Sequence, residues 1–323
     1  MRNRGQVLEW ERRWSLPAGL ATLAGVALVV ASAFAIGSVS GNGEAALLRS
    51  AHEHSSAVTL ASVLQAAGFA LFVAPLVVLF RAAAARSDRM RYQLIGLVVA
   101  APLFLSASAL LNAVATNDAA SEFVAGKATP GISAKAATED CQSELKEKGA
   151  KEFSEEFGGG ARPAALKQCA SRKVADEKAS NAVSEASTRG LATGFGLGGR
   201  LGLAVALFYS CLYGMRTGLL TRFWGSLGMA LGVAALLLLV QFTLIWFIYF
   251  GLLLIGRLPG GRPPAWAAGE AIPWPTPGEK AAANLEPTEP PDAPAPPKLG
   301  TGNGGSPADG GTGGERRKRK QRD

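Results

Sequence analysis

Long apolar blocks, separated by shorter segments that carry the charges, set the pattern of this sequence. The blocks have 16 to 24 residues each. About 20 apolar residues in a helix span the roughly 30 Å hydrocarbon core of a bilayer. We therefore predict an all-α membrane protein, with spans near 16–38, 57–80, 93–115, 191–214, 219–239 and 242–257.

The last apolar stretch, 224–256, has 33 residues without a charge. As a single helix it would be about 50 Å long, too long for one crossing and too short for two full ones. Arginines flank it on both sides, at Arg216, Arg222, Arg257 and Arg262. Because positive charges favour the cytoplasmic side, we expect two short spans that turn near Gln241. The total is then about six spans, or five if 224–256 crosses once.

The first block follows a segment that contains four arginines: Arg2, Arg4, Arg12 and Arg13. Small residues at Ala31-Ser32-Ala33 would suit the cleavage site of a signal peptide. The apolar run is longer than that of a usual signal peptide, so we favour an uncleaved span. Cleavage of 1–35 stays open as the alternative, and the topology downstream is the same in both cases.

Arginines are distributed unequally between the connecting segments, with four in 81–92, two in 215–223 and one in 40–56. The positive-inside rule places the arginine-rich segments and the N-terminus in the cytoplasm. Segment 116–190 is then extracytoplasmic, and six spans return the C-terminal tail to the cytoplasm. The expected location is a plasma membrane of bacterial type.

Segment 116–190 is polar and nearly neutral, with 11 Lys and Arg against 12 Asp and Glu. Its Ala, Glu, Lys and Ser favour helix, so we predict a helical hairpin that breaks between Gly149 and Arg162. Cys141 and Cys169 lie 28 residues apart, equally far from residue 155. Antiparallel helices that fold about that point would bring the two sulfurs level, and we predict a disulfide. This register requires 149–161 to be largely non-helical.

Three glycines at intervals of four, Gly194, Gly198 and Gly202, lie on one face of the fourth span. Small residues let another helix approach closely within a membrane. The stripe predicts helix packing, either inside one chain or in a homo-oligomer.

Polar residues also occur within the spans, at Arg200, Gln65 and Asn112, and at the expected turn between the last two spans, at Gln241. Such residues often mark a transport pathway, because polar groups are costly in hydrocarbon. For Arg200, a side chain that reaches toward the interface is the simpler interpretation.

Catalytic chemistry finds little support in the sequence. The predicted spans contain no His, Asp or Glu, which excludes the usual intramembrane hydrolase sites. His52-Glu53-His54 holds both histidines, but two residues that alternate on a helix do not make a metal site. We expect neither an enzyme nor a cofactor or metal.

The C-terminal segment, 259–323, contains 13 of the 18 prolines and is predicted to be disordered, with Trp266 and Trp274 near the membrane interface. Six of the eight net positive charges lie at its end, and they favour an anionic lipid surface over a specific nucleic acid: Arg316, Arg317, Lys318, Arg319, Lys320 and Arg322. The chain thus divides into 1–115, 116–190, 191–258 and 259–323.

Two stretches near the end, MRTGLLTRFWGSLGMALGV and GRLPGGRPPAWAAGEAIPWPTPGE, resemble the closing region of uncharacterised bacterial multi-spanning membrane proteins. The first is also similar to the last part of DUF4386-type integral membrane proteins. The resemblance covers about a quarter of the chain and implies membrane insertion, without an activity.

Two hypotheses follow for the function. The first is a non-enzymatic envelope protein that presents the disulfide-stapled hairpin to a partner. The alternative is a small transporter or channel subunit that uses the polar residues within the spans.

Overall fold

The structure, a computed structural model, describes residues 4–129, 131–157, 162–237, 240–258 and 260–274. The chain divides into two compact units, Met1–Trp274 and Pro275–Asp323. The described residues all belong to the first unit. The six basic residues predicted to bind anionic lipid therefore lie outside the described residues.

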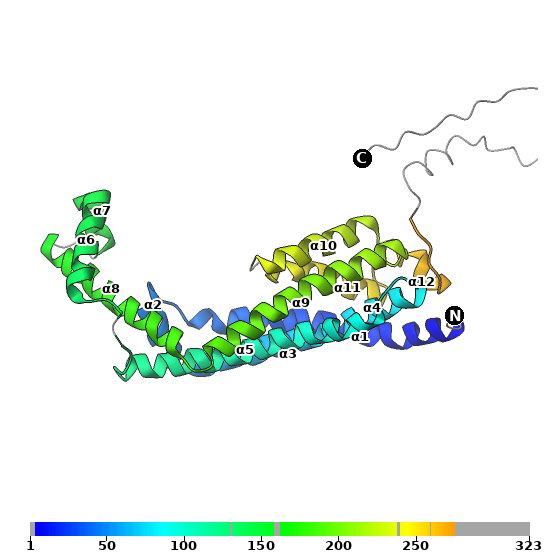
Figure 1. The fold of residues 1–323 in the computed structure, drawn as a ribbon, viewed down its shortest axis with the longest axis horizontal. Coiled ribbons are helices and arrows are strands. Elements are labelled where there is room, and N and C mark those ends of the chain that lie inside the picture. Colours follow the sequence, from blue (N-terminus) through cyan, green and yellow to red (C-terminus); the bar gives the residue numbers. More distant parts are fainter. Residues whose placement is uncertain (1–3, 130, 158–161, 238–239, 259, 275–323) are drawn as a thin grey trace, which may run out of the picture. The chain divides into compact units, whose positions relative to one another are not determined.

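The described residues form helices and no strands, as predicted for an all-α protein (Figure 1). The α-helices are α1 (Arg4–Ala35), α2 (Glu44–Glu53), α3 (Ser55–Leu71), α4 (Val73–Arg86), α5 (Ile95–Val124), α6 (Ala134–Lys148), α7 (Ala150–Glu156), α8 (Arg162–Glu185), α9 (Arg189–Arg216), α10 (Arg222–Leu236), α11 (Thr243–Ile255) and α12 (Pro264–Ala268). Short 3-10 turns are η1 (Ile36–Ser38), η2 (Tyr92–Leu94) and η3 (Val240–Phe242).

Four helical stretches are long and apolar enough to cross a membrane: Arg4–Ser38, Ser55–Arg86, Tyr92–Val124 and Arg189–Arg216. They correspond to the first four predicted spans and fit insertion into a membrane. Helix α1 packs on α3, α3 on α5, and α5 on α9, and we call these four stretches the row; α4, the second half of the second stretch, also packs on α9. Figure 1 shows α9 and α5 side by side.

Glycines allow the close approach of α1 to its neighbours. A Cβ added to Gly25 would lie 2.8 Å from the carbonyl oxygen of Gly68 on α3, and one added to Gly19 would lie 2.9 Å from that of Gly251 on α11. Both distances are too short for a real Cβ, so only glycine permits these contacts. Packing of this kind holds helices together in lipid, where the hydrophobic effect is absent.

Helices α10 and α11, which we call the short helix pair, occupy the long apolar stretch 224–256. They contain 15 and 13 residues, or about 20–22 Å of helix each, less than the ~30 Å hydrocarbon core. They run antiparallel: Trp224 of α10 stacks on Tyr249 of α11 with ring centroids 3.7 Å apart, and Gly228, one turn later in α10, faces Trp246, one turn earlier in α11. The stretch is therefore not one helix. The turn contains η3, which includes Gln241, and the count of about six spans is not confirmed.

The short helix pair is packed into the row by large side chains. Trp246, Phe247 and Phe250 of α11 are fully buried, and Phe72 stacks on Phe247 with ring centroids 4.1 Å apart. Helix α10 packs along α9, and α11 packs along α1. The pair thus joins the two outer helices of the row.

The arginine-bearing ends of the helices lie together. Arg86 at the end of α4 binds Glu11 near the start of α1, and the hydroxyl of Tyr213 near the end of α9 donates to the carbonyl of Arg89 at 3.3 Å. We call this the arginine end. The opposite end, with α2 and the α6–α8 segment, is called the hairpin end.

The predicted hairpin is present as α6, α7 and α8, which we call the stapled hairpin because Cys141 and Cys169 form a disulfide with Cα atoms 6.1 Å apart. One detail of the prediction was wrong. Segment 149–161 was expected to be largely non-helical, yet Ala150–Glu156 is helix α7. The two cysteines still lie opposite each other, because the chain breaks at Gly149 (φ 81°). Helix α6 ends there, and α7 is a separate helix.

Candidate functional site

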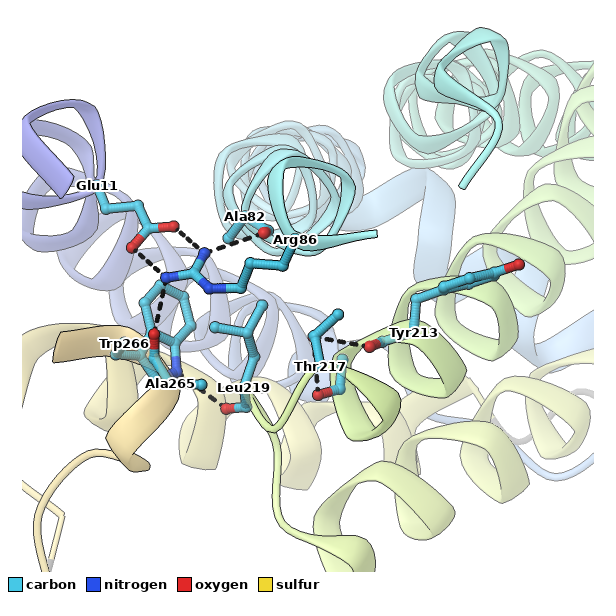
Figure 2. A network of polar contacts seen from close by, with 9 residues as sticks. Glu11, Ala82, Arg86, Tyr213, Thr217, Leu219, Ala265 and Trp266 are labelled. Carbon is cyan, nitrogen blue, oxygen red and sulfur yellow. Dashed lines mark hydrogen bonds and ion pairs between the residues drawn. The ribbon is translucent and has the colours of Figure 1, made fainter. Parts of the chain in front are cut away.

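A buried ion pair joins α1 to α4 at the arginine end (Figure 2). The side chains of Arg86 and Glu11 are 0% and 5% exposed. Arg86 donates through both terminal nitrogens to the two carboxylate oxygens, with Nη2 2.9 Å from Oε2. Its Nη1 also donates to the carbonyl of Ala82 at 3.0 Å, and its Nη2 to that of Ala265 at 2.9 Å. The two charges thus neutralise each other, and the guanidinium is held by two backbone carbonyls as well.

Residues 260–274 fold back onto the turn between α9 and α10. The indole N–H of Trp266 donates to the carbonyl of Leu219 at 2.9 Å, and that of Trp274 to the carbonyl of Leu220 at 2.8 Å. The prediction that disorder begins at 259 was therefore wrong for 260–274. The location of the two tryptophans at the membrane interface stays a prediction. Proline at the first position starts α12, and Gly269, at φ 67°, ends it.

Glu11, Arg86, Trp266 and their carbonyl partners form one network, which we call the polar clamp. Figure 2 shows that it ties together α1, α4, the α9–α10 turn and α12. Its two ionised groups satisfy each other, and neither is placed to attack or protonate a substrate. We assign the polar clamp a structural role.

A pocket of about 470 Å³ lies at the hairpin end, between α2, α5 and α8. Its walls mix charged, polar and apolar side chains: Arg49, His52, Glu53, Phe123, Val124, Ser171, Val174, Ala175 and Lys178. Asp176 of α8 helps to fix the pocket, because its Oδ1 accepts the backbone N–H of Ala45 at 2.9 Å in the first turn of α2.

Two cations in this pocket have no carboxylate partner among the residues that the structure describes. The guanidinium of Arg49 lies 5.6 Å from the centre of the Phe123 ring. The ammonium of Lys178 donates to the carbonyl of Gly126 at 3.2 Å. No ion pair in the described part of the chain involves either residue. The pocket also contains the carboxylate of Glu53, so its two cations exceed its acids by one and can accept an acidic group.

His52 lines this pocket, whereas the Nδ1 of His54 lies 3.0 Å from the carbonyl of Ser50. Within the described ranges, no group of three His, Cys, Asp or Glu residues is arranged to hold a metal ion.

Charged residues brace the stapled hairpin on its exposed surface. Lys148 binds Glu144 at 2.9 Å and Glu156 at 2.8 Å, and Lys173 binds Glu144 at 3.2 Å. The hydrogen bond from Lys148 lowers the pKa of Glu144 against the opposing effect of partial burial, and the hydrogen bond from Lys173 lowers it further. The hydrogen bonds to Glu156 and Glu144 raise the pKa of Lys148. These pairs link α6, α7 and α8 around the disulfide.

The structure does not bring the predicted intramembrane polar residues together. Asn112 accepts from Arg189 at 3.1 Å and donates to Ser108 at 3.3 Å. Arg200 and Gln65 are partly exposed, and Gln241 is exposed. No hydrogen bond between described residues joins any two of these four positions.

The glycine contact with α5 uses a different face from the one predicted. A Cβ on Gly196 would lie 2.9 Å from Ser108 Oγ, one on Gly199 2.8 Å from Leu105, and one on Gly202 2.8 Å from Ala101. Gly198 meets only Phe104, at 3.4 Å, and Gly194 is exposed with open space around it. The glycines that contact α5, Gly196, Gly199 and Gly202, are thus spaced by three residues. Only Gly202 belongs to the predicted set as well.

Sequence reasoning missed the polar clamp and the two pocket cations. Glu11 was visible as an acid inside an arginine-rich segment, which suggests a partner among nearby arginines. Nothing in the sequence indicated that Arg49 and Lys178 would meet, because α2 and α8 are far apart along the chain.

Comparison of the chain with protein-family models, with curated proteins and with solved structures finds no match. The similarity to DUF4386-type proteins stays a prediction, and the functional argument rests on the geometry described above.

Proposed function

We propose that this protein is a non-enzymatic membrane protein that presents the stapled hairpin to a partner in the cell envelope. The observation that carries the proposal is that the hairpin has an apolar core of its own, closed by a disulfide. Its core residues are Ala137, Cys141, Leu145, Phe153, Phe157, Ala165, Cys169 and Ala170.

This core is separate from the two other apolar clusters that the described residues form. One of these fills the membrane-spanning row and the short helix pair, and the other joins α2, α5 and the last turns of α8. The outer part of the hairpin is therefore supported by its own contacts and leaves much of its polar surface free. A small self-supporting module on a membrane anchor suits binding better than it suits transport.

The proposed topology places the arginine end in the cytoplasm and the stapled hairpin outside. The arginine count of the connecting segments supports this orientation. The disulfide supports it too, since such bonds persist in oxidising compartments. In this arrangement the four long stretches cross the plasma membrane, and the short helix pair enters and returns on the cytoplasmic side.

The pocket at the base of the hairpin suggests what the partner offers. Arg49 and Lys178 present positive charge beside the apolar surface of Phe123 and Val174. An acidic side chain next to an apolar one, on a protein partner, would satisfy both features. The alternative of a transporter has weaker support, because the polar residues of the spans are scattered.

The test uses a photoreactive amino acid at Glu139 or Ser143, two exposed positions on α6, in intact cells. We expect a discrete cross-linked protein, identified by mass spectrometry. The same amino acid at Arg13, at the arginine end, is the control and should not capture that protein. Absence of a protein cross-link at both hairpin positions would contradict the proposal.

A second variant separates the hairpin from the anchor. Replacing 132–174 by a short Gly-Ser linker removes the hairpin core but keeps the part of α8 that packs on α2 and α5. The variant should still insert in the membrane and should lose the partner. If the partner still copurifies with this variant, the hairpin is not the binding surface.

A further inference from the structure

Two cavities between α1 and α4 lie next to each other, and we call them together the groove. One, of about 240 Å³, which we call the polar compartment, has the polar side chains Gln6, Glu11 and Arg81 beside the apolar Val7, Trp10 and Ala85. The second, of about 330 Å³, is apolar and includes Trp14, Ala18 and Val78. Trp10 and Arg81 line both cavities, so they share a wall. The groove thus has a polar compartment that continues into an apolar one.

The groove runs from the arginine end into the membrane. On α1 its lining extends from Gln6 to Ala18, a distance of about 18 Å along a helix. On α4 and the end of α3 it extends in the same direction, from Ala85 to Ala70. The polar compartment therefore lies at headgroup level, and the apolar compartment lies at the depth of one leaflet.

Arg81 supplies an available positive charge where the two compartments meet. Its guanidinium lies 4.5 Å from the centre of the Trp10 ring. Glu11, the acid in the polar compartment, is already bound to Arg86. No ion pair among the described residues involves Arg81. An anion at this position would meet a cation that no carboxylate neutralises.

Small side chains shape the apolar compartment. Ala18, Ala70 and Ala74 leave a slot between larger neighbours such as Trp14 and Leu71. The slot is narrow and lined by apolar side chains, which suits a flexible hydrocarbon chain.

We propose that this groove binds one anionic phospholipid of the leaflet at the arginine end. Its phosphate lies against Arg81, and one acyl chain lies in the slot beside Trp14. The polar headgroup fits the compartment near Gln6, and the hydrocarbon covers apolar surface that no other part of the described chain packs on. The inference rests on membrane insertion and is independent of the partner proposed for the stapled hairpin.

The test is native mass spectrometry of the full-length protein after exchange into detergent with phosphatidylglycerol. Arg81→Gln removes the charge, and Ala74→Leu fills the slot while keeping Arg81. Each variant should retain about tenfold less phosphatidylglycerol than the wild type. Arg12→Gln, at an exposed position on α1, is the matched control and should leave retention unchanged.

Two further measurements make each outcome decisive. Excess inorganic phosphate should not displace the lipid, and displacement by phosphate alone would show a simple anion site. In the wild type, phosphatidylglycerol with a photoreactive group on its acyl chain should label peptides that contain Trp14 or Val78. Wild-type retention in either Arg81→Gln or Ala74→Leu, or labelling elsewhere only, would overturn the proposal.

Discussion

Glu11 and Arg86 show how much a single buried pair contributes to this fold. The two residues are 75 positions apart, and both are almost fully buried at the arginine end. Removing one member of a buried pair leaves an uncompensated charge, which costs about 3–5 kcal/mol. Replacing both members by apolar residues of similar size often leaves the free energy of unfolding nearly unchanged.

We therefore expect Glu11→Leu and Arg86→Leu each to lower the free energy of unfolding by about 3–5 kcal/mol. The double variant should recover most of this loss. Denaturant titration of the protein in detergent micelles measures the effect, with Arg12→Leu as an exposed control. If the double variant were as unstable as the sum of the single ones, the ion pair would not be the cause.

The ion pairs of the stapled hairpin predict a dependence on pH. The pKa of Glu144 is lowered by its bonds to Lys148 and Lys173, so its contribution to stability is present above its ordinary pKa and is lost on acidification. The melting temperature of the hairpin should fall as pH drops below about 4.5. In Glu144→Gln this decrease should be smaller, as measured by circular dichroism. If the melting temperature fell as much in Glu144→Gln as in the wild type, other groups would cause the decrease at acidic pH.

The pKa of Lys148 is raised, so the pH dependence of its contribution to stability is opposite to that of Glu144. Its contribution is complete below its ordinary pKa and is lost only in strongly alkaline solution. At neutral pH both groups are therefore charged and paired. The pairs lie on an exposed surface, so salt should weaken them.

At the scale of helices, hydropathy predicted the long elements well and their packing faces poorly. Four of the predicted spans are long apolar helices, since length and composition are local properties. The packing face of α9 depends on how α5 lies against it. A spacing of four was chosen from the sequence, whereas Gly196, Gly199 and Gly202 make the contact with a spacing of three.

This difference gives a direct comparison between two glycines of α9. Gly202→Leu would place side-chain atoms against Ala101 and should lower stability by about 1–3 kcal/mol through overpacking. Gly194→Leu meets open space and should change stability by less than about 0.5 kcal/mol. Thermal unfolding in micelles checks both. Equal effects would place Gly194 in a packing contact as well, for example in a homo-oligomer.

The disulfide was predictable because two cysteines lay equally far from a likely turn. The segment 260–274 was not, because its prolines suggested disorder and its bonds are made to the turn after α9, about 50 residues away along the chain. Tertiary hydrogen bonds of the two tryptophans override the local composition. The polar clamp escaped prediction for the same reason.

Loss of the disulfide should loosen the stapled hairpin. The bond closes a loop of 28 residues, for which chain entropy gives a stabilisation of about 3–4 kcal/mol. Cys141→Ser should make α7 and its surroundings sensitive to limited proteolysis while α9 and the short helix pair stay protected. Cys211→Ala, at the buried free cysteine of α9, is the control. Equal protease resistance of the hairpin in both variants would contradict this account.

At the scale of the whole molecule, the proposed architecture is a membrane anchor that carries a small external module. The anchor is held at the arginine end by the polar clamp, and the module has its own core and disulfide. The central claim is that these two ends face opposite sides of the membrane. Both the proposed partner and the orientation of the lipid groove depend on that sidedness.

The most direct test is labelling of cysteines in intact cells with a membrane-impermeant maleimide, with and without an impermeant reductant. The account predicts that Cys141 and Cys169 are labelled in intact cells only after reduction, and that the buried Cys211 is not labelled. Labelling of Cys141 and Cys169 only after lysis, whether or not reductant is added, would place the stapled hairpin in the cytoplasm and contradict the account.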